Sequence, residues 1–181
     1  MVWVLIGVVV LAGVYVGAAY NGLVSANEGV DAQWAQVESQ YQRRFDLVPN
    51  LVASVQGVMK QEQKVFADIA DARTKYTGAQ TIDDKAAAAS QFEGSLGRLL
   101  VVMEAYPQLR SVETVTALMA ELAGTENRIS VERMRYNEMV RDYNISVKTF
   151  PKSLAASLFG FHARTMFEAA AGADTVPKVQ L

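Results

Sequence analysis

Apolar residues recur at intervals of three and four along most of the chain. Such spacing places them on one face of a helix, with polar residues on the opposite face. The pattern predicts a long helical stretch over about residues 23–76. Its apolar face is formed by Leu23, Val30, Trp34, Val37, Tyr41, Phe45, Val48, Val52, Val55, Met59, Phe66, Ile69 and Tyr76.

Three further segments follow this stretch. Residues 77–84 have the composition of a turn, and Thr81 and Asp83 are candidate N-caps for a helix over about 84–103. Pro107 opens a second long stretch of about 40 residues, or ~60 Å at 1.5 Å per residue. These patterns predict an all-α protein in which long helices form an elongated antiparallel bundle.

No charged side chain occurs before Glu28, and residues 1–20 are apolar throughout. A helix over residues 1–20 would be ~30 Å long, which matches the hydrocarbon core of a bilayer. Trp3 and Tyr20 lie near its two ends, where aromatic rings favour the membrane interface. We therefore predict a transmembrane anchor over 1–22, a helical bundle domain over 23–170 and a C-terminal tail over 171–181.

A cleaved signal peptide is the competing interpretation of the N-terminal segment. Gly17-Ala18-Ala19 has the small residues of a cleavage site. The long apolar run and the lack of a basic region before it favour the anchor. The first basic residue is Arg43, so the positive-inside rule gives no orientation for the anchor.

The apolar N-terminal segment also contains a row of small residues. Gly13 and Gly17 are four residues apart and would leave a groove in which a second helix can pack closely. Glycine is also common in membrane helices that make no such contact. Both interpretations stay open at this point.

Pro49 interrupts the first long stretch. Proline removes one backbone donor and clashes with the carbonyl group four residues earlier, which belongs to Phe45. Either the helix is kinked there, or one helix ends near Asp46 and another begins at Pro49. The apolar pattern keeps its phase across Pro49, so we expect a kink or a tight joint and not a reversal.

Composition excludes several kinds of chemistry. The formal net charge is −2, which gives no basic surface for nucleic acid. The chain has no cysteine and one histidine, so disulfides, thiolate catalysis and Cys-based zinc sites are excluded, and a Ser-His pair is disfavoured. It also has no glycine-rich phosphate loop. We expect a protein that is not an enzyme and that uses no metal or cofactor.

Several polar residues lie on or beside the apolar faces. A structural polar layer is the first interpretation, since a buried asparagine or ion pair can fix the register of packed helices. An anion-binding or acid/base site is the second, but the Glu-x-x-His signature of catalytic carboxylate bundles is absent. We favour the structural layer, formed by Arg43, Arg44, Asp46, Pro49, Asn50, Glu126, Arg133, Asn137 and Asn144.

Five of these residues belong to a distinctive motif, Arg43-Arg44-x-Asp46-Leu47-x-Pro49-Asn50-Leu51-Val52. It is preceded by Tyr20-Asn21-x-Leu23-Val24, Asn27 and Ala32-x-Trp34, and followed by Arg133-x-x-Tyr136-Asn137-x-x-Val140-x-x-Tyr143-Asn144 and Gly160-Phe161. In this order the motifs resemble the LemA family of bacterial membrane proteins, over nearly the whole chain. The resemblance implies one transmembrane helix and an all-helical domain of long antiparallel helices. It implies no catalytic residues.

Two functions are compatible with these features. The first is a non-enzymatic scaffold that is anchored in the bacterial inner membrane and assembles with copies of itself. The glycine row would serve this assembly, together with an apolar C-terminal segment formed by Leu154, Leu158, Phe159, Phe161, Met166 and Phe167. The second is an adaptor for a membrane or envelope partner. The family resemblance suggests a membrane metalloprotease as that partner, because genes for such proteases often neighbour genes of this family.

Overall fold

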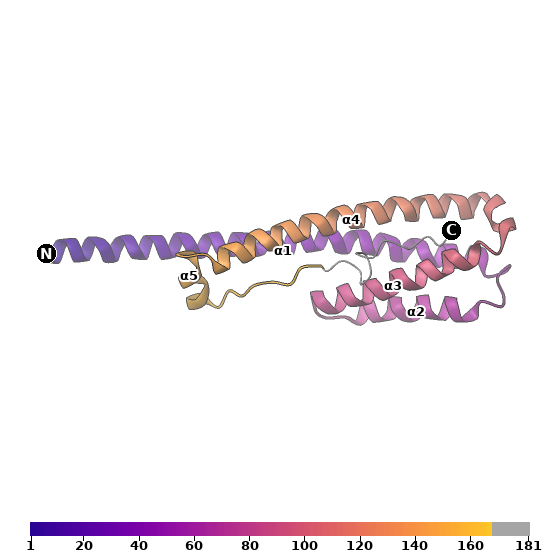
Figure 1. Ribbon diagram of the computed structural model, residues 1–181, viewed down its shortest axis with the longest axis horizontal. Coiled ribbons are helices and arrows are strands. Elements are labelled where there is room, and N and C mark those ends of the chain that lie inside the picture. Colours follow the sequence, from indigo (N-terminus) through magenta and orange to yellow (C-terminus); the bar gives the residue numbers. More distant parts are fainter. Residues whose placement is uncertain (168–181) are drawn as a thin grey trace, which may run out of the picture. The chain divides into compact units, whose positions relative to one another are not determined.

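The computed structural model describes residues 1–167 and is built from helices (Figure 1). No strand occurs within this range, which confirms the predicted all-α class. The predicted tail over 171–181 and the last residues of the predicted bundle domain lie outside the described residues. The elements in order are α1 (Val2–Val55), α2 (Gln63–Gly78), α3 (Ile82–Met103), the 3-10 helix η1 (Pro107–Ser111), α4 (Glu113–Lys148) and α5 (Lys152–Phe159).

The chain divides into two compact units. The first unit contains residues 1–38 and 130–166, and the second contains residues 39–129 together with Phe167. Helices α1 and α4 each contribute residues to both units, whereas α2 and α3 belong to the second and α5 belongs to the first. The two units are described separately below.

Helix α1 begins in the apolar N-terminal segment and continues without interruption to Val55. The apolar segment therefore leads directly into the helical domain. The helix is long and apolar enough to cross a membrane, and the residues of that apolar part are almost entirely exposed. Pro49 lies inside α1. The alternative in which one helix ends near Asp46 and another begins at Pro49 is therefore wrong.

The prediction of a single helical stretch over 23–76 is also wrong. Helix α1 ends at Val55, a turn follows, and α2 begins at Gln63. The apolar spacing does not show this break, because Met59 within the turn is buried like Val55 before it and Ile69 after it. Two helices that cover the same core continue the apolar pattern across the turn between them.

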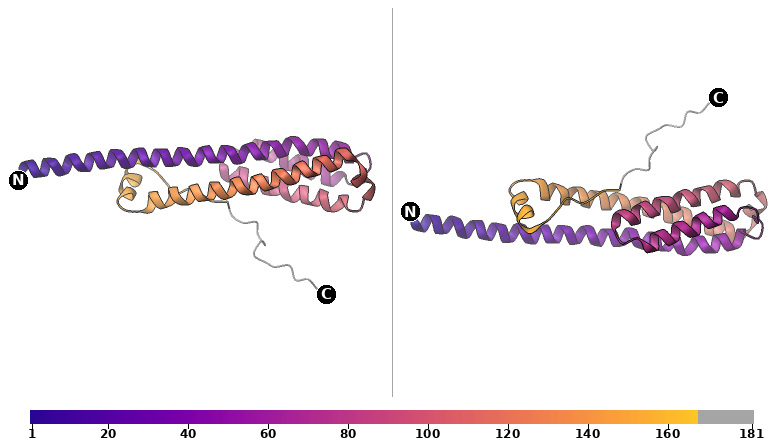
Figure 2. Two further views of the ribbon diagram at one scale, coloured as in Figure 1. Left: turned by 90° about the horizontal axis from the view of Figure 1, so that it is seen from above. Right: turned by 90° about the horizontal axis from the view of Figure 1, so that it is seen from below.

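The second unit has an aromatic core to which three helices contribute. The Phe45 ring of α1 lies 4.5 Å from the Tyr76 ring of α2 and 4.6 Å from the Phe92 ring of α3, measured between centroids. Helices α2 and α3 lie side by side and antiparallel (Figure 2). Their outer faces are joined by a hydrogen bond from Lys75 to Gln91, 3.0 Å.

In the first unit, α4 runs antiparallel to the early part of α1. Gln33 of α1 donates a hydrogen bond to the Glu132 carboxylate at 2.7 Å. The rings of Trp34 and Tyr136 meet edge to face at 5.6 Å. Closer to the N-terminus, Ala19 and Leu23 form a small apolar cluster with two buried residues of α5, Ala155 and Ala156.

The helix ends follow the local sequence signals in part. Thr81 caps α3 by accepting a hydrogen bond from the Asp84 backbone N–H at 3.1 Å, as predicted. Pro107 does not open the second long helix. It begins η1, and Val112 adopts an extended conformation before α4 starts at Glu113. Gly160 ends α5 with φ 76°, a left-handed conformation that glycine adopts without steric cost.

Candidate functional site

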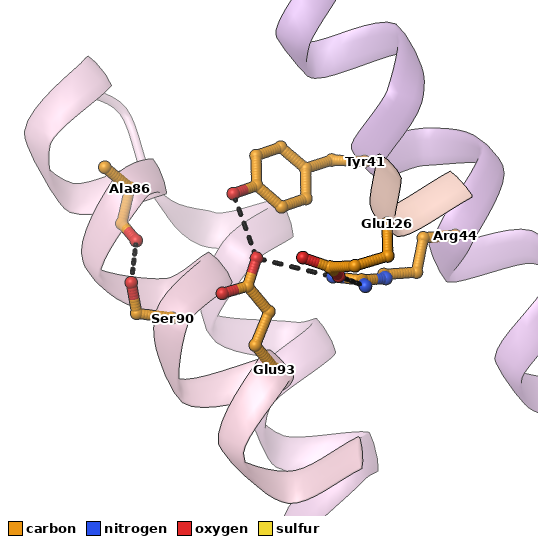
Figure 3. Close-up of polar contacts among 6 residues, drawn as sticks. All are labelled: Tyr41, Arg44, Ala86, Ser90, Glu93 and Glu126. Atoms are coloured by element: carbon orange, nitrogen blue, oxygen red, sulfur yellow. Dashed lines mark hydrogen bonds and ion pairs between the residues drawn. The ribbon is translucent and has the colours of Figure 1, made fainter. Parts of the chain in front are cut away.

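Arg44 is a buried charge of the second unit, with an exposed fraction of 3%. Figure 3 shows its side chain together with those of Tyr41, Glu93 and Glu126. Its Nη1 lies 3.3 Å from Glu93 Oε1 of α3, and its Nη2 forms an ion pair with Glu126 of α4. Tyr41, three residues earlier on α1, donates its hydroxyl to the same Glu93 oxygen at 3.3 Å. One guanidinium group thus joins α1, α3 and α4.

The arrangement follows from the charge and shape of arginine. A buried guanidinium group keeps its charge and needs acceptors in several directions, which two carboxylates from different helices supply. The carboxylate side chains are only partly withdrawn from water, with exposed fractions of 26% for Glu93 and 49% for Glu126. Solvent therefore stabilises the surplus negative charge of this group of three.

An open groove of about 330 Å³ lies beside these charges. Arg44, Glu93 and Glu126 contribute polar groups to its wall, and the remaining wall is mostly apolar, with Leu96, Leu100, Met119 and Leu122 among its residues. The described residues contain no group of three His, Cys, Asp or Glu side chains that could hold a metal ion. What this geometry supplies is a charged link between helices.

A second polar network lies in the first unit, around Arg164. The backbone N–H of Arg164 donates to Asn144 Oδ1 at 2.7 Å, and Asn144 Nδ2 donates to the Arg164 carbonyl at 2.8 Å. The Arg164 side chain donates to Asn27 Oδ1 at 3.0 Å and pairs with Asp31 Oδ1 at 2.6 Å. The hydrogen bond to Asp31 raises the pKa of Arg164 further above its usual value.

This network fastens the non-helical segment after α5, residues 160–166, to two helices. Asn144 belongs to α4, and Asn27 and Asp31 belong to α1. Tyr136 adds a third attachment, because its hydroxyl donates to the Thr165 carbonyl at 3.4 Å. We call residues 160–166 the C-terminal strap.

The residues predicted to form one polar layer belong to both units and differ in burial. Arg44 and Glu126 form the ion pair of the second unit. Asn144 holds the strap in the first unit, where Arg133 and Asn137 are half-buried. The remaining four residues are exposed on α1, which contradicts their predicted place among the buried side chains; they are Arg43, Asp46, Pro49 and Asn50.

Two of these exposed residues, Asp46 and Asn50, are bonded within their own helix. Gln42 donates to Asp46 Oδ1 at 3.1 Å, and Asn50 Nδ2 donates to the Asp46 carbonyl at 3.4 Å. The reason for the error is helical geometry, because each residue turns about 100° from its neighbour. Arg44 lies three residues after Tyr41 and shares its buried face, whereas Arg43 points to solvent.

Sequence reasoning missed three of the residues that form these networks. Glu93 directly follows the buried Phe92, and Asp31 directly follows the buried Val30, so each lies at the border of an apolar face. An acidic residue at such a border is the signal that points to a partner for a buried arginine. Arg164 lies in a non-helical segment, where no periodicity marks its direction.

The glycine row of the N-terminal segment faces open space. A Cβ atom added at Gly13 or at Gly17 would meet no atom within 4 Å. Among residues 1–167 nothing packs on this row, which is accessible to another helix.

Comparison with known proteins gives relatives and a family. The chain is 28% identical to magnetosome proteins MamQ 1 and MamQ 2 of Paramagnetospirillum magneticum, over 86% of this chain and 67% of each relative. It is 26% identical to magnetosome protein MamQ of Magnetospirillum gryphiswaldense over the same shares. The model of the LemA family matches residues 33–181. The chain belongs to the LemA family.

Proposed function

We propose that this protein is a non-enzymatic scaffold, anchored in the bacterial inner membrane by the start of α1, that assembles with copies of itself. The observation that carries the proposal is the continuity of α1. Residues 2–20 of this helix are uncharged, apolar and almost entirely exposed, while residues further along the same helix are buried within the protein.

An exposed apolar helix of this length is stable only in an apolar environment. Lipid supplies one, and the span of ~30 Å fits the bilayer core. Within lipid, side-chain burial no longer drives helix association, so close packing at small residues becomes the main attraction. The accessible row of Gly13 and Gly17 is suited to such packing.

Helix α1 runs from the apolar segment into the helical domain without a break, and this continuity affects how copies of the domain would be arranged. A helix that leaves the membrane without a flexible linker transmits its direction to the domain that it carries. Copies that pack through their membrane helices therefore hold their helical domains in a defined register. This property supports a scaffold more than an enzyme.

The test is the mass of the particle extracted in a mild detergent, measured by light scattering on the full chain. The expected result is an assembly of several copies, which Gly13→Leu combined with Gly17→Leu reduces. Gly7→Leu is the matched control, because Gly7 lies in the same span and about 120° away from Gly13 around the helix. It is expected to leave the mass unchanged.

Two outcomes would contradict the scaffold. A single-copy particle from the unaltered chain would exclude self-assembly through the membrane helix in that detergent. A single copy that is recovered with one specific membrane protein after crosslinking in cells would favour the adaptor. An equal effect of the Gly7 and Gly13/Gly17 variants would remove the glycine row from the proposal and leave the anchor in place.

A further inference from the structure

Helix α5 has two apolar faces, and only one of them is covered by the protein. Ala155 and Ala156 are buried against Ala19 and Leu23 of α1. On the opposite side Leu154 and Leu158, four residues apart, have exposed fractions of 65% and 71%. A short helix that faced water on this side would carry polar residues there.

The exposed face continues beyond the ends of α5. Phe150, just before the helix, has an exposed fraction of 74%, and Phe159 at its end is exposed as well. Four large apolar side chains thus gather around one short helix, and monomeric soluble proteins rarely expose such a cluster. The charged residues nearest to it along the chain are Lys148 and Lys152, both exposed.

Helix α5 lies beside the end of the apolar span of α1, and this position indicates what covers its exposed face. The Phe159 ring lies 4.8 Å from the Tyr20 ring, and the Phe161 ring lies 5.9 Å from it, measured between centroids. Tyr20 is the last residue of the apolar span of ~30 Å, and the polar Asn21 follows it. Figure 2 shows the earlier turns of α1 projecting past α5.

We propose that α5 is a second membrane contact, which lies in the interface of the bilayer beside the transmembrane part of α1. The inference rests on the proposed anchor, because the anchor sets the level of the bilayer surface. The exposed face of Phe150, Leu154, Leu158 and Phe159 meets the upper part of the acyl chains. The amphiphilic stems of Lys148 and Lys152 reach from there to lipid phosphates.

The contact has a structural consequence for the rest of the first unit. The strap that follows α5 is tied to α1 and α4 through Arg164 and Asn144. With α5 held at the surface and the strap held on both helices, the antiparallel pair of α1 and α4 is supported at two points. A single membrane helix alone leaves its tilt free, and a second contact at the interface restricts it.

Single cysteines placed in the full chain test the inference directly, since the chain has no cysteine of its own. Leu158→Cys and, separately, Leu154→Cys report on α5. Val10→Cys reports on the anchor, and Met134→Cys is the matched control, an exposed apolar position on α4 in the same unit. Each variant is labelled with a polarity-sensitive fluorophore and reconstituted in vesicles of phosphatidylcholine and phosphatidylglycerol.

The vesicles contain lipids with a quencher at the top or at the middle of the acyl chain. We expect the shallow quencher to quench labels at 154 and 158 several-fold more strongly than the label at 134. Iodide in the water should show the opposite order. The deep quencher should act on the label at position 10.

The outcomes distinguish a failure of the second membrane contact at α5 from a failure of the proposed transmembrane anchor. Quenching at position 10 without quenching at 154 and 158 would overturn the second contact and leave the anchor intact. No quenching at position 10 would overturn the anchor and the inference with it. A third outcome is that neither the lipid quencher nor iodide quenches the labels at 154 and 158, and that quenching appears only when the protein is diluted with lipid. This outcome would show that a second copy of the chain covers α5, and it would also overturn the inference.

Discussion

Arg44 and Arg164 are both paired with carboxylates, but they hold different kinds of structure. Arg44 projects from a helix, is almost completely buried and joins three helices of the second unit. Arg164 lies in the non-helical strap, with an exposed side-chain fraction of 23%, and uses its backbone as well as its side chain. Arg44 links three helices to one another, whereas Arg164 helps to attach a non-helical segment to α1 and α4 through Asn27, Asp31 and Asn144.

The comparison separates global from local stability. Breaking a buried ion pair destabilises the cooperative unit, because the charge left behind has lost its solvent and its partner. Loss of a strap attachment affects a segment that can open alone, since its polar groups find water readily. Three changes, ordered by expected effect, test this distinction.

Arg44→Ala is expected to have the largest effect. It removes the link between α1, α3 and α4 and leaves a cavity beside Tyr41. The free energy of unfolding should fall by about 2–4 kcal/mol, below the full cost for a buried pair because Glu93 and Glu126 are partly solvated. Thermal unfolding of the full chain in detergent, followed by circular dichroism, measures the change.

The control for this prediction is the adjacent arginine. Arg43→Ala removes the same charge from an exposed position on the same helix, so its effect should stay within about 0.5 kcal/mol. If the two variants unfold alike, the burial of Arg44 makes no special contribution, and the contrast between the two arginines fails.

Asn144→Ala should act on the strap and hardly on the whole protein. It removes both hydrogen bonds between the Asn144 side chain and the Arg164 backbone, a loss of about 1–2 kcal/mol. The Arg164 amide should then exchange with solvent hydrogen about 5–30 times faster. Hydrogen exchange followed by mass spectrometry of the strap peptide measures this.

Glu138→Ala is the control, because Glu138 is exposed on the same helix and has no described role in the strap. It should leave exchange in residues 160–166 unchanged. Unchanged exchange in the strap amides of Asn144→Ala, combined with faster exchange throughout α4, would mean that Asn144 supports the helix pair and not the strap.

The smallest effect concerns the dependence of stability on pH. Burial raises the pKa of the Tyr143 hydroxyl above its usual value of 10.0, while the charge of Arg164 lowers it and that of Asp31 raises it. Above pH 10 the unfolded chain therefore releases this proton before the folded chain does, and the free energy of unfolding falls as pH rises. Tyr143→Phe should flatten this fall.

Denaturant unfolding of both proteins at several pH values between 8 and 11, chosen to bracket the ordinary tyrosine pKa of about 10, measures the difference. Below pH 9 the two curves should run parallel, because Tyr143 is neutral in both states. Curves that stay parallel through pH 11 would show that Tyr143 titrates alike in the folded and unfolded chain.

How much of the candidate site was predictable depends on the kind of element that carries each residue. Arg44 and Glu126 lie on helices whose apolar faces the periodicity identified, and both were singled out. The partner Glu93 was not, because spacing along one helix does not specify which residues of another helix it meets. The prediction that Arg43, Asp46 and Asn50 belong to a buried polar layer is wrong, because they are exposed. Residues that are consecutive in a sequence motif point to different faces of a helix.

The amino-acid sequence by itself determined the helical class, the apolar span at the start of α1, the N-cap at Thr81 and most of the buried side chains. These features depend on local hydrogen bonding and on a period of 3.6 residues, which neighbouring residues specify. Only the tertiary structure decided the break between α1 and α2, the pairing of Arg44 with Glu93 and the path of the strap over α1 and α4. These depend on contacts between residues far apart in the chain, which the spacing of residues within one helix does not specify.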